Sequence, residues 1–153
     1  MDDKISIVKE WIDFASRDIN SAKYLLNMRP VPLEIVCYHC EQAAEKTLKG
    51  YLIYQDVEPP RTHILQLLCK MCEDIDETFK EISEYCGNLT LYGVQPRYPF
   101  EIDITENDMK KAIVDADRVM EFVFQRIQLT EEIIQDNDEQ EEQQKNAAGQ
   151  QLT

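Results

Sequence analysis

The stretch from Leu33 to Gln55, LEIVCYHCEQAAEKTLKGYLIYQ, decides the fold of this chain. Its small and apolar residues recur every three or four positions, the spacing of one face of a helix, and show no alternation typical of a strand. Pro59-Pro60 cannot continue a helix and therefore sets a limit to its C-terminal end. We predict a helix over residues 33–55 whose core face includes Cys37, Cys40, Ala44 and Leu48.

Four further segments have the helical period. They are predicted at about residues 3–28, 62–72, 76–91 and from 105 as far as 134. Pro30 ends the first of them. Thr105 supplies a hydroxyl cap for the last, followed by acidic residues that favour the positive end of the helix dipole. The interval 92–104, which contains Gly93 and two prolines, is predicted to be irregular.

The first helix carries apolar residues that we expect to face the core: Ile7, Trp11, Phe14 or Ala15, Ile19 or Ala22, and Leu25 or Leu26. Their helical spacing assigns Trp11 and Phe14 to core packing rather than to a stacking platform. Long helices joined by short connections indicate an all-α fold, an antiparallel up-and-down bundle of four or five helices.

Length and charge limit the domain organisation and the partners. The 153 residues are consistent with one domain, which we place at residues 1–134. Residues 135–153 form an acidic, Gln/Glu-rich tail with almost nothing to bury, predicted to be disordered or to extend the last helix. The net charge of −14 opposes non-specific binding to nucleic acid. The chain has neither the apolar run of a membrane span nor that of a signal peptide, so we expect a cytoplasmic protein.

Five cysteines include the pairs Cys37-x-x-Cys40 and Cys69-x-x-Cys72, a spacing also found in zinc sites. Both pairs lie within apolar helical stripes rather than on glycine-rich turns. Because a free cysteine behaves as a small buried hydrophobe, we predict core thiols and assign no metal ligand. A zinc-stabilised helical protein is the less favoured alternative.

Four polar residues of the 33–55 segment, His39, Gln42, Lys46 and Lys49, follow the i, i+3, i+7, i+10 spacing of one helix face. An imidazole, a carboxamide and two ammonium groups aligned in this way are donors suited to a phosphate or another anion. The alternative is an ordinary solvated face on which Glu45 pairs with Lys49. The residues by themselves leave both interpretations open.

Several motifs in order resemble the HEPN domain family, named for higher eukaryotes and prokaryotes nucleotide-binding. They are Trp11, Ala15 and Asp18, then CYHCEQAAEKTLK at 37–49, PPRTHIL at 59–65, Leu68, Leu89, Tyr92 and Arg97-Tyr98-Pro99. The resemblance covers about residues 5–128. It implies a helical bundle, commonly a homodimer, that often occurs beside a minimal nucleotidyltransferase as a toxin–antitoxin-like pair.

Several HEPN branches are metal-independent ribonucleases with an Arg-x(4–6)-His motif, whereas others bind nucleotides or proteins. This chain has two histidines. The residues at which the motif would require arginine are Pro32, Leu33 and Glu34 before His39, and Asp56, Val57 and Glu58 before His63. The resemblance therefore implies the branch without the ribonuclease motif.

We predict a non-catalytic, homodimeric binding module for a nucleotide or a partner protein such as a minimal nucleotidyltransferase, without a cofactor. The candidate ligand-binding residues are His39, Gln42, Lys46, Lys49, Arg61, His63, Arg97 and Tyr98. Thr62 is expected to cap the helix that His63 begins, where free N–H groups would also suit a phosphate. Arg97 either clamps a phosphate or anchors its loop. The alternative function is a divergent metal-independent endoribonuclease with His39 or His63 as general base.

Overall fold

The computed structural model describes residues 2–93, 103–127 and 142–149, and every regular element in these ranges is helical. The elements are α1 (Asp2–Leu25), α2 (Leu33–Tyr54), α3 (Leu65–Ile75), the 3-10 helix η1 (Glu77–Ile82), α4 (Ser83–Thr90), the 3-10 helix η2 (Leu91–Gly93) and α5 (Glu106–Phe124). The predicted all-α helical bundle is confirmed. Within the acidic tail, residues 142–149 are helical and exposed; the division at residue 134 lies outside the described residues and stays a prediction.

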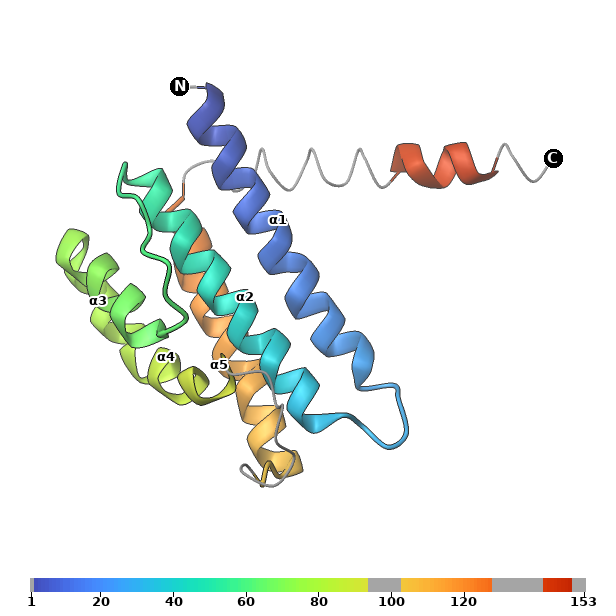
Figure 1. Ribbon diagram of the computed structural model, residues 1–153. Helices are drawn as coiled ribbons and strands as arrows, with labels where there is room; N and C mark the ends of the chain where they lie inside the picture. The colour runs from blue at the N-terminus through green and yellow to red at the C-terminus, as the bar shows by residue number, and fades with distance from the viewer. Residues whose placement is uncertain (1, 94–102, 128–141, 150–153) are drawn as a thin grey trace.

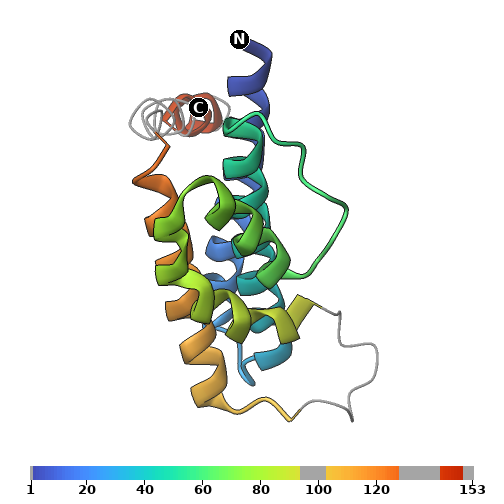
Figure 2. The ribbon, with the colours of Figure 1, turned by 90° about the vertical axis from the view of Figure 1, so that its left-hand side faces the viewer.

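Helix α2 is the central element of the bundle, since it packs against α1, α3, α4, α5 and η2. In Figure 1, α1 and α2 form an antiparallel hairpin with α1 at the edge, and α5 runs beside α2 in the same direction. In Figure 2, α3 and α4 lie in front of α2 and thus on the side away from α1. None of the described helices is both long and apolar enough to cross a membrane.

The face that α1 turns toward the core agrees with the prediction at Ala15, Ile19 and Ala22 and differs from it at Ile7 and Phe14. Its buried residues are Val8, Ile12, Ala15, Ile19 and Ala22. Ile7 and Phe14 are 43% and 48% exposed, so their assignment to the core was wrong. The helix carries two apolar stripes, and the stripe with alanines packs inward because small side chains let α1 approach α2 closely. Gly50 on α2 shows this closeness: a Cβ there would lie 3.2 Å from Cβ of Trp11.

Several predicted helix boundaries also change, and α5 ends at Phe124 rather than extending to residue 134. Helix α3 begins at Leu65 rather than at residue 62 or 63, and the hydroxyl of Thr62 accepts a hydrogen bond from the Ile64 amide outside the helix. The predicted helix at 76–91 is divided into η1, α4 and η2 because the Asp76 carboxylate accepts from the Thr78 amide and starts a tighter turn. The predicted start of α5 is confirmed, since Thr105 and Asp108 cap its first turn reciprocally.

All five cysteines are buried and free, as the apolar stripes predicted. Burial raises the pKa of the Cys37 thiol to about 12, which keeps it protonated at neutral pH. Among the described residues, no three His, Cys, Asp or Glu side chains are placed to share a metal ion.

An aromatic cluster joins η1 to α2 and α5. Phe79 of η1 has no exposed surface. Its ring lies 4.6 Å from that of Tyr51 on α2 and 5.1 Å from that of Phe122 on α5, centroid to centroid. Phe79 therefore packs η1 against two helices that are distant from it in sequence.

Phe79→Ala is expected to lower the free energy of unfolding by about 3–5 kcal/mol, because it removes a fully buried ring and leaves a cavity. Tyr24→Ala is the matched control: Tyr24 is 74% exposed, and its loss is expected to cost less than about 0.5 kcal/mol. Urea unfolding of the two variants measures the difference. Equal losses would contradict the described core.

Candidate functional site

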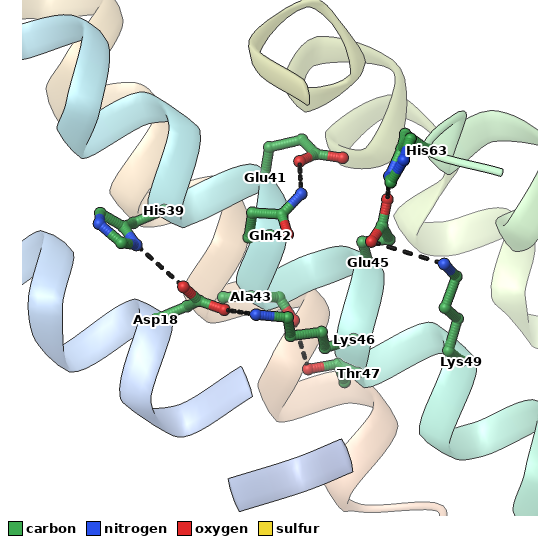
Figure 3. Close-up of polar contacts among 10 residues, drawn as sticks. All are labelled: Asp18, His39, Glu41, Gln42, Ala43, Glu45, Lys46, Thr47, Lys49 and His63. Atoms are coloured by element: carbon green, nitrogen blue, oxygen red, sulfur yellow. Dashed lines mark hydrogen bonds and ion pairs between the residues drawn. The ribbon is translucent and has the colours of Figure 1, made fainter. Parts of the chain in front are cut away.

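The polar residues of α2 do not form a free row of donors, because each is bound to a carboxyl group of the chain. Figure 3 shows two clusters on this helix. The first, which we call the α1 cluster, contains Asp18, His39 and Lys46. The second, the loop cluster, contains Glu45, Lys49 and His63. Gln42 instead donates to its neighbour Glu41.

In the α1 cluster, a buried carboxylate on α1 holds two donors of α2. Oδ1 of Asp18 lies 2.9 Å from Nδ1 of His39, and Oδ2 accepts from the Lys46 ammonium. An ionised carboxylate only accepts hydrogen bonds, so Nδ1 of His39 carries the proton that makes this contact. The ring is thereby oriented, and no described residue forms a hydrogen bond with its Nε2. The ammonium of Lys46 also lies 5.9 Å from the centre of the Phe14 ring.

In the loop cluster, a buried carboxylate on α2 holds the connection between α2 and α3. Oε1 of Glu45 lies 2.7 Å from Nδ1 of His63, and Oε2 lies 3.6 Å from the Lys49 ammonium. Residues 55–64 run back along α2 to make this contact possible (Figure 1). The Glu45–Lys49 pair is the one that the solvated-face interpretation expected, but both side chains are buried and His63 joins them.

Glu41 is the most deeply buried acid in the described chain, with no exposed surface. Its Oε2 accepts from Nε2 of Gln42 at 2.8 Å, whereas its Oε1 has no hydrogen-bond partner among the described residues. Burial raises the pKa of this carboxyl from its ordinary 4.5 to about 8. At neutral pH the group is therefore mainly a neutral acid.

The structure brings some of the predicted site residues together and leaves others apart or outside the described ranges. His39 and Lys46 meet at Asp18, and Lys49 and His63 meet at Glu45. Arg61 is exposed near the loop cluster. His63 precedes α3, so its assignment as the first helical residue was wrong. Arg97 and Tyr98 lie outside the described residues.

Sequence reasoning paired Glu45 with Lys49 in one of its two interpretations, but it missed the roles of Asp18 and Glu41. Glu41 follows Cys37 by four residues and precedes Leu48 by seven, which places a carboxyl on the apolar stripe. Such an acid must be neutralised or paired inside the fold, and this was the available signal. Asp18 gave no comparable signal, because its partners lie on another helix.

Comparisons with known proteins identify the family. The model of the HEPN domain matches residues 8–133. The chain belongs to the HEPN domain family. It is similar to the crystal structure of ST0689, an archaeal HEPN homologue, with 27% identity and a TM-score of 0.63 over 78% of this chain and 96% of that one.

The fold of this HEPN domain is also that of TT1696 from Thermus thermophilus. That similarity has 22% identity and a TM-score of 0.66, and it covers 78% of this chain and 98% of the other. No curated protein matches the chain.

Asp18→Asn is expected to lower the free energy of unfolding by about 1–3 kcal/mol, because Lys46 and His39 lose a charged acceptor within a largely buried cluster. Asp13→Asn is the matched control on the same helix. Asp13 pairs at 3.1 Å with Arg17, whose side chain is 69% exposed, and such surface pairs contribute about 0–1 kcal/mol. Denaturant unfolding at pH 7 compares the variants, and an equal effect of both would show that the α1 cluster is not structurally important.

Proposed function

We propose that this HEPN domain is a non-catalytic, homodimeric binding module that recognises a nucleotide or a partner protein through the polar face of α2. The observation that carries the proposal is the orientation of two imidazoles by buried carboxylates. Asp18 holds His39 and Glu45 holds His63, each through Nδ1. Both rings keep part of their surface accessible, His63 most of it.

The chemistry of these clusters favours an anionic group such as a phosphate or a partner's carboxylate. An imidazole whose Nδ1 donates inward offers a second donor only when Nε2 is also protonated. A ring that donates to an anion therefore does so with both of its nitrogens protonated. Arg61, exposed beside His63, supplies a planar donor that suits phosphate.

The positive charges of the face are already balanced, which limits what it binds. Asp18 neutralises Lys46, and Glu45 neutralises Lys49. A nucleotide must compete with these internal acids for the ammonium groups, so it is recognised by oriented hydrogen bonds rather than by excess charge. The missing Arg-x(4–6)-His motif supports binding over cleavage, and a minimal nucleotidyltransferase is the proposed protein partner.

A second candidate function is metal-independent cleavage of RNA. The 2.9 Å contact between Asp18 and His39 favours it, because a carboxylate that orients an imidazole is the usual arrangement behind a general base. Lys46 forms an ion pair with the same carboxylate and would stabilise negative charge on the reacting phosphate.

Calorimetric titration with ATP and with a short RNA in EDTA tests both functions. Recognition predicts saturable binding that weakens about tenfold or more in Arg61→Ala and Lys46→Ala, since each loses a charged hydrogen bond. Lys70→Ala on α3, an exposed lysine with two acidic neighbours, is the matched control and should bind normally.

Cleavage of the RNA in EDTA that is lost in His39→Ala would contradict simple recognition and support the second function. No binding at millimolar nucleotide would remove the nucleotide as ligand. Co-purification with a minimal nucleotidyltransferase, lost in Arg61→Ala, then tests the protein partner.

The proposed homodimer uses the outer apolar stripe of α1. Ile7 and Phe14 are seven residues apart, so they share a face, with the half-buried Trp11 between them. Helix α1 lies at the edge of the bundle (Figure 1), and no described element covers this face. A second copy that packs its own α1 against the stripe would bury both sets of side chains.

Phe14→Glu is expected to convert the dimer into a monomer, because it places a charge at the most exposed large residue of the stripe. Leu67→Glu is the matched control: Leu67 is 45% exposed but lies on α3, away from the stripe. Sedimentation equilibrium gives the mass of each variant. A Phe14→Glu protein that stays dimeric would place the interface elsewhere.

A further inference from the structure

The carboxyl of Glu41 on α2 lies under η2, an element of three residues. It has no exposed surface, and its Oε1 is buried without a hydrogen-bond partner. Native proteins rarely leave a buried acceptor unpaired, because each costs about 1–3 kcal/mol. The functional clusters on the same helix do not use this oxygen, since Lys49 and His63 bind Glu45 instead.

The main chain of η2 covers this carboxyl directly. A Cβ added to Gly93 would lie 2.9 Å from both Cδ and Oε1 of Glu41, closer than atoms of this kind approach each other. A side chain at this position would force either the Glu41 carboxyl or η2 to move, so the close contact between η2 and α2 depends on a glycine. Because η2 has three residues and its Leu91 is 70% exposed, it is held by fewer contacts than the helices around it.

No described cation is available to neutralise an ionised Glu41. The charged groups that act on it are Glu45 and Lys49 on α2 and Asp18 on α1. Lys49 is paired with Glu45, and Asp18 adds negative charge. From η2, the titratable group is Tyr92, whose pKa burial raises to about 12 and which therefore stays neutral below that pH.

We propose that Glu41 is a proton-operated latch: its neutral carboxyl lets η2 close over α2, and loss of the proton opens η2. An ionised carboxylate with an unpaired oxygen must regain water, and moving η2 is the least costly way to admit it. The opening exposes the side of α2 that carries Gln42. The inference goes beyond the proposed function and needs no ligand.

The direction of the pH effect follows from the pKa of Glu41. Burial raises that pKa from its ordinary 4.5 to about 8 in the closed state, so the closed state binds the proton more tightly than the open one. Closure is therefore fully stable below about pH 4.5 and loses stability as the pH rises toward 8. Above the closed-state pKa the effect levels off.

Hydrogen exchange measured by mass spectrometry between pH 5.5 and 8 tests the latch, with rates corrected for the intrinsic pH dependence of exchange. In the wild-type protein, protection of a peptide containing Leu91–Gly93 should fall about tenfold per pH unit, as one linked proton requires. In Glu41→Gln the same peptide should keep its protection at every pH. A peptide from α1 is the internal control and should not change.

Gly93→Ala provides a second, independent variant. Its Cβ competes with the Glu41 carboxyl for space, so η2 should close less firmly and the Leu91–Gly93 peptide should be less protected than in the wild type already at pH 5.5. Equal pH dependence in the wild type and Glu41→Gln would overturn the proposal, as would wild-type protection in Gly93→Ala. A loss of protection that includes α1 would show global unfolding rather than a latch.

Discussion

The pairing of buried charges along α2 is the constraint on which the rest of the structure depends. A helix surrounded by other elements has almost no face left for water, and α2 buries Glu41, Glu45 and Lys49 together with its apolar residues. An ionised side chain removed from water must find a partner or lose its charge. Glu45 is paired with Lys49 and His63. Glu41 has only the Gln42 amide as a partner and holds its proton up to about pH 8.

These pairs also determine how the neighbouring elements are attached. Asp18 links α1 to α2 beyond their apolar contact, and Glu45 draws the end of the 55–64 connection back against α2 through His63. The same bonds set the orientation of both histidines. The proposed recognition therefore uses residues that also hold the fold together, and a ligand that took a donor from its carboxylate would loosen a helix contact.

Membership of the HEPN family accounts for the bundle but not for the details of this face. The similarity to TT1696, at 22% identity, extends to the fold alone. In this chain, acids lie behind the donors: Asp18 and Glu45 pair with lysines, and Glu41 is covered by Gly93. The function must be argued from these groups, because one fold serves different activities.

The sequence by itself determined the helices, because periodicity, proline breaks and the Thr105 cap act locally along the chain. It also placed the cysteines inside, since they lie on apolar stripes. It did not determine which of two stripes α1 turns inward, because both have the helical period and only the fit of Ala15 and Ala22 against α2 selects one. Tertiary structure also decided which acid meets which donor, since Asp18 and His39 are 21 positions apart and on different helices. Ion pairs of this kind depend on the distance between elements in space, which no local pattern encodes.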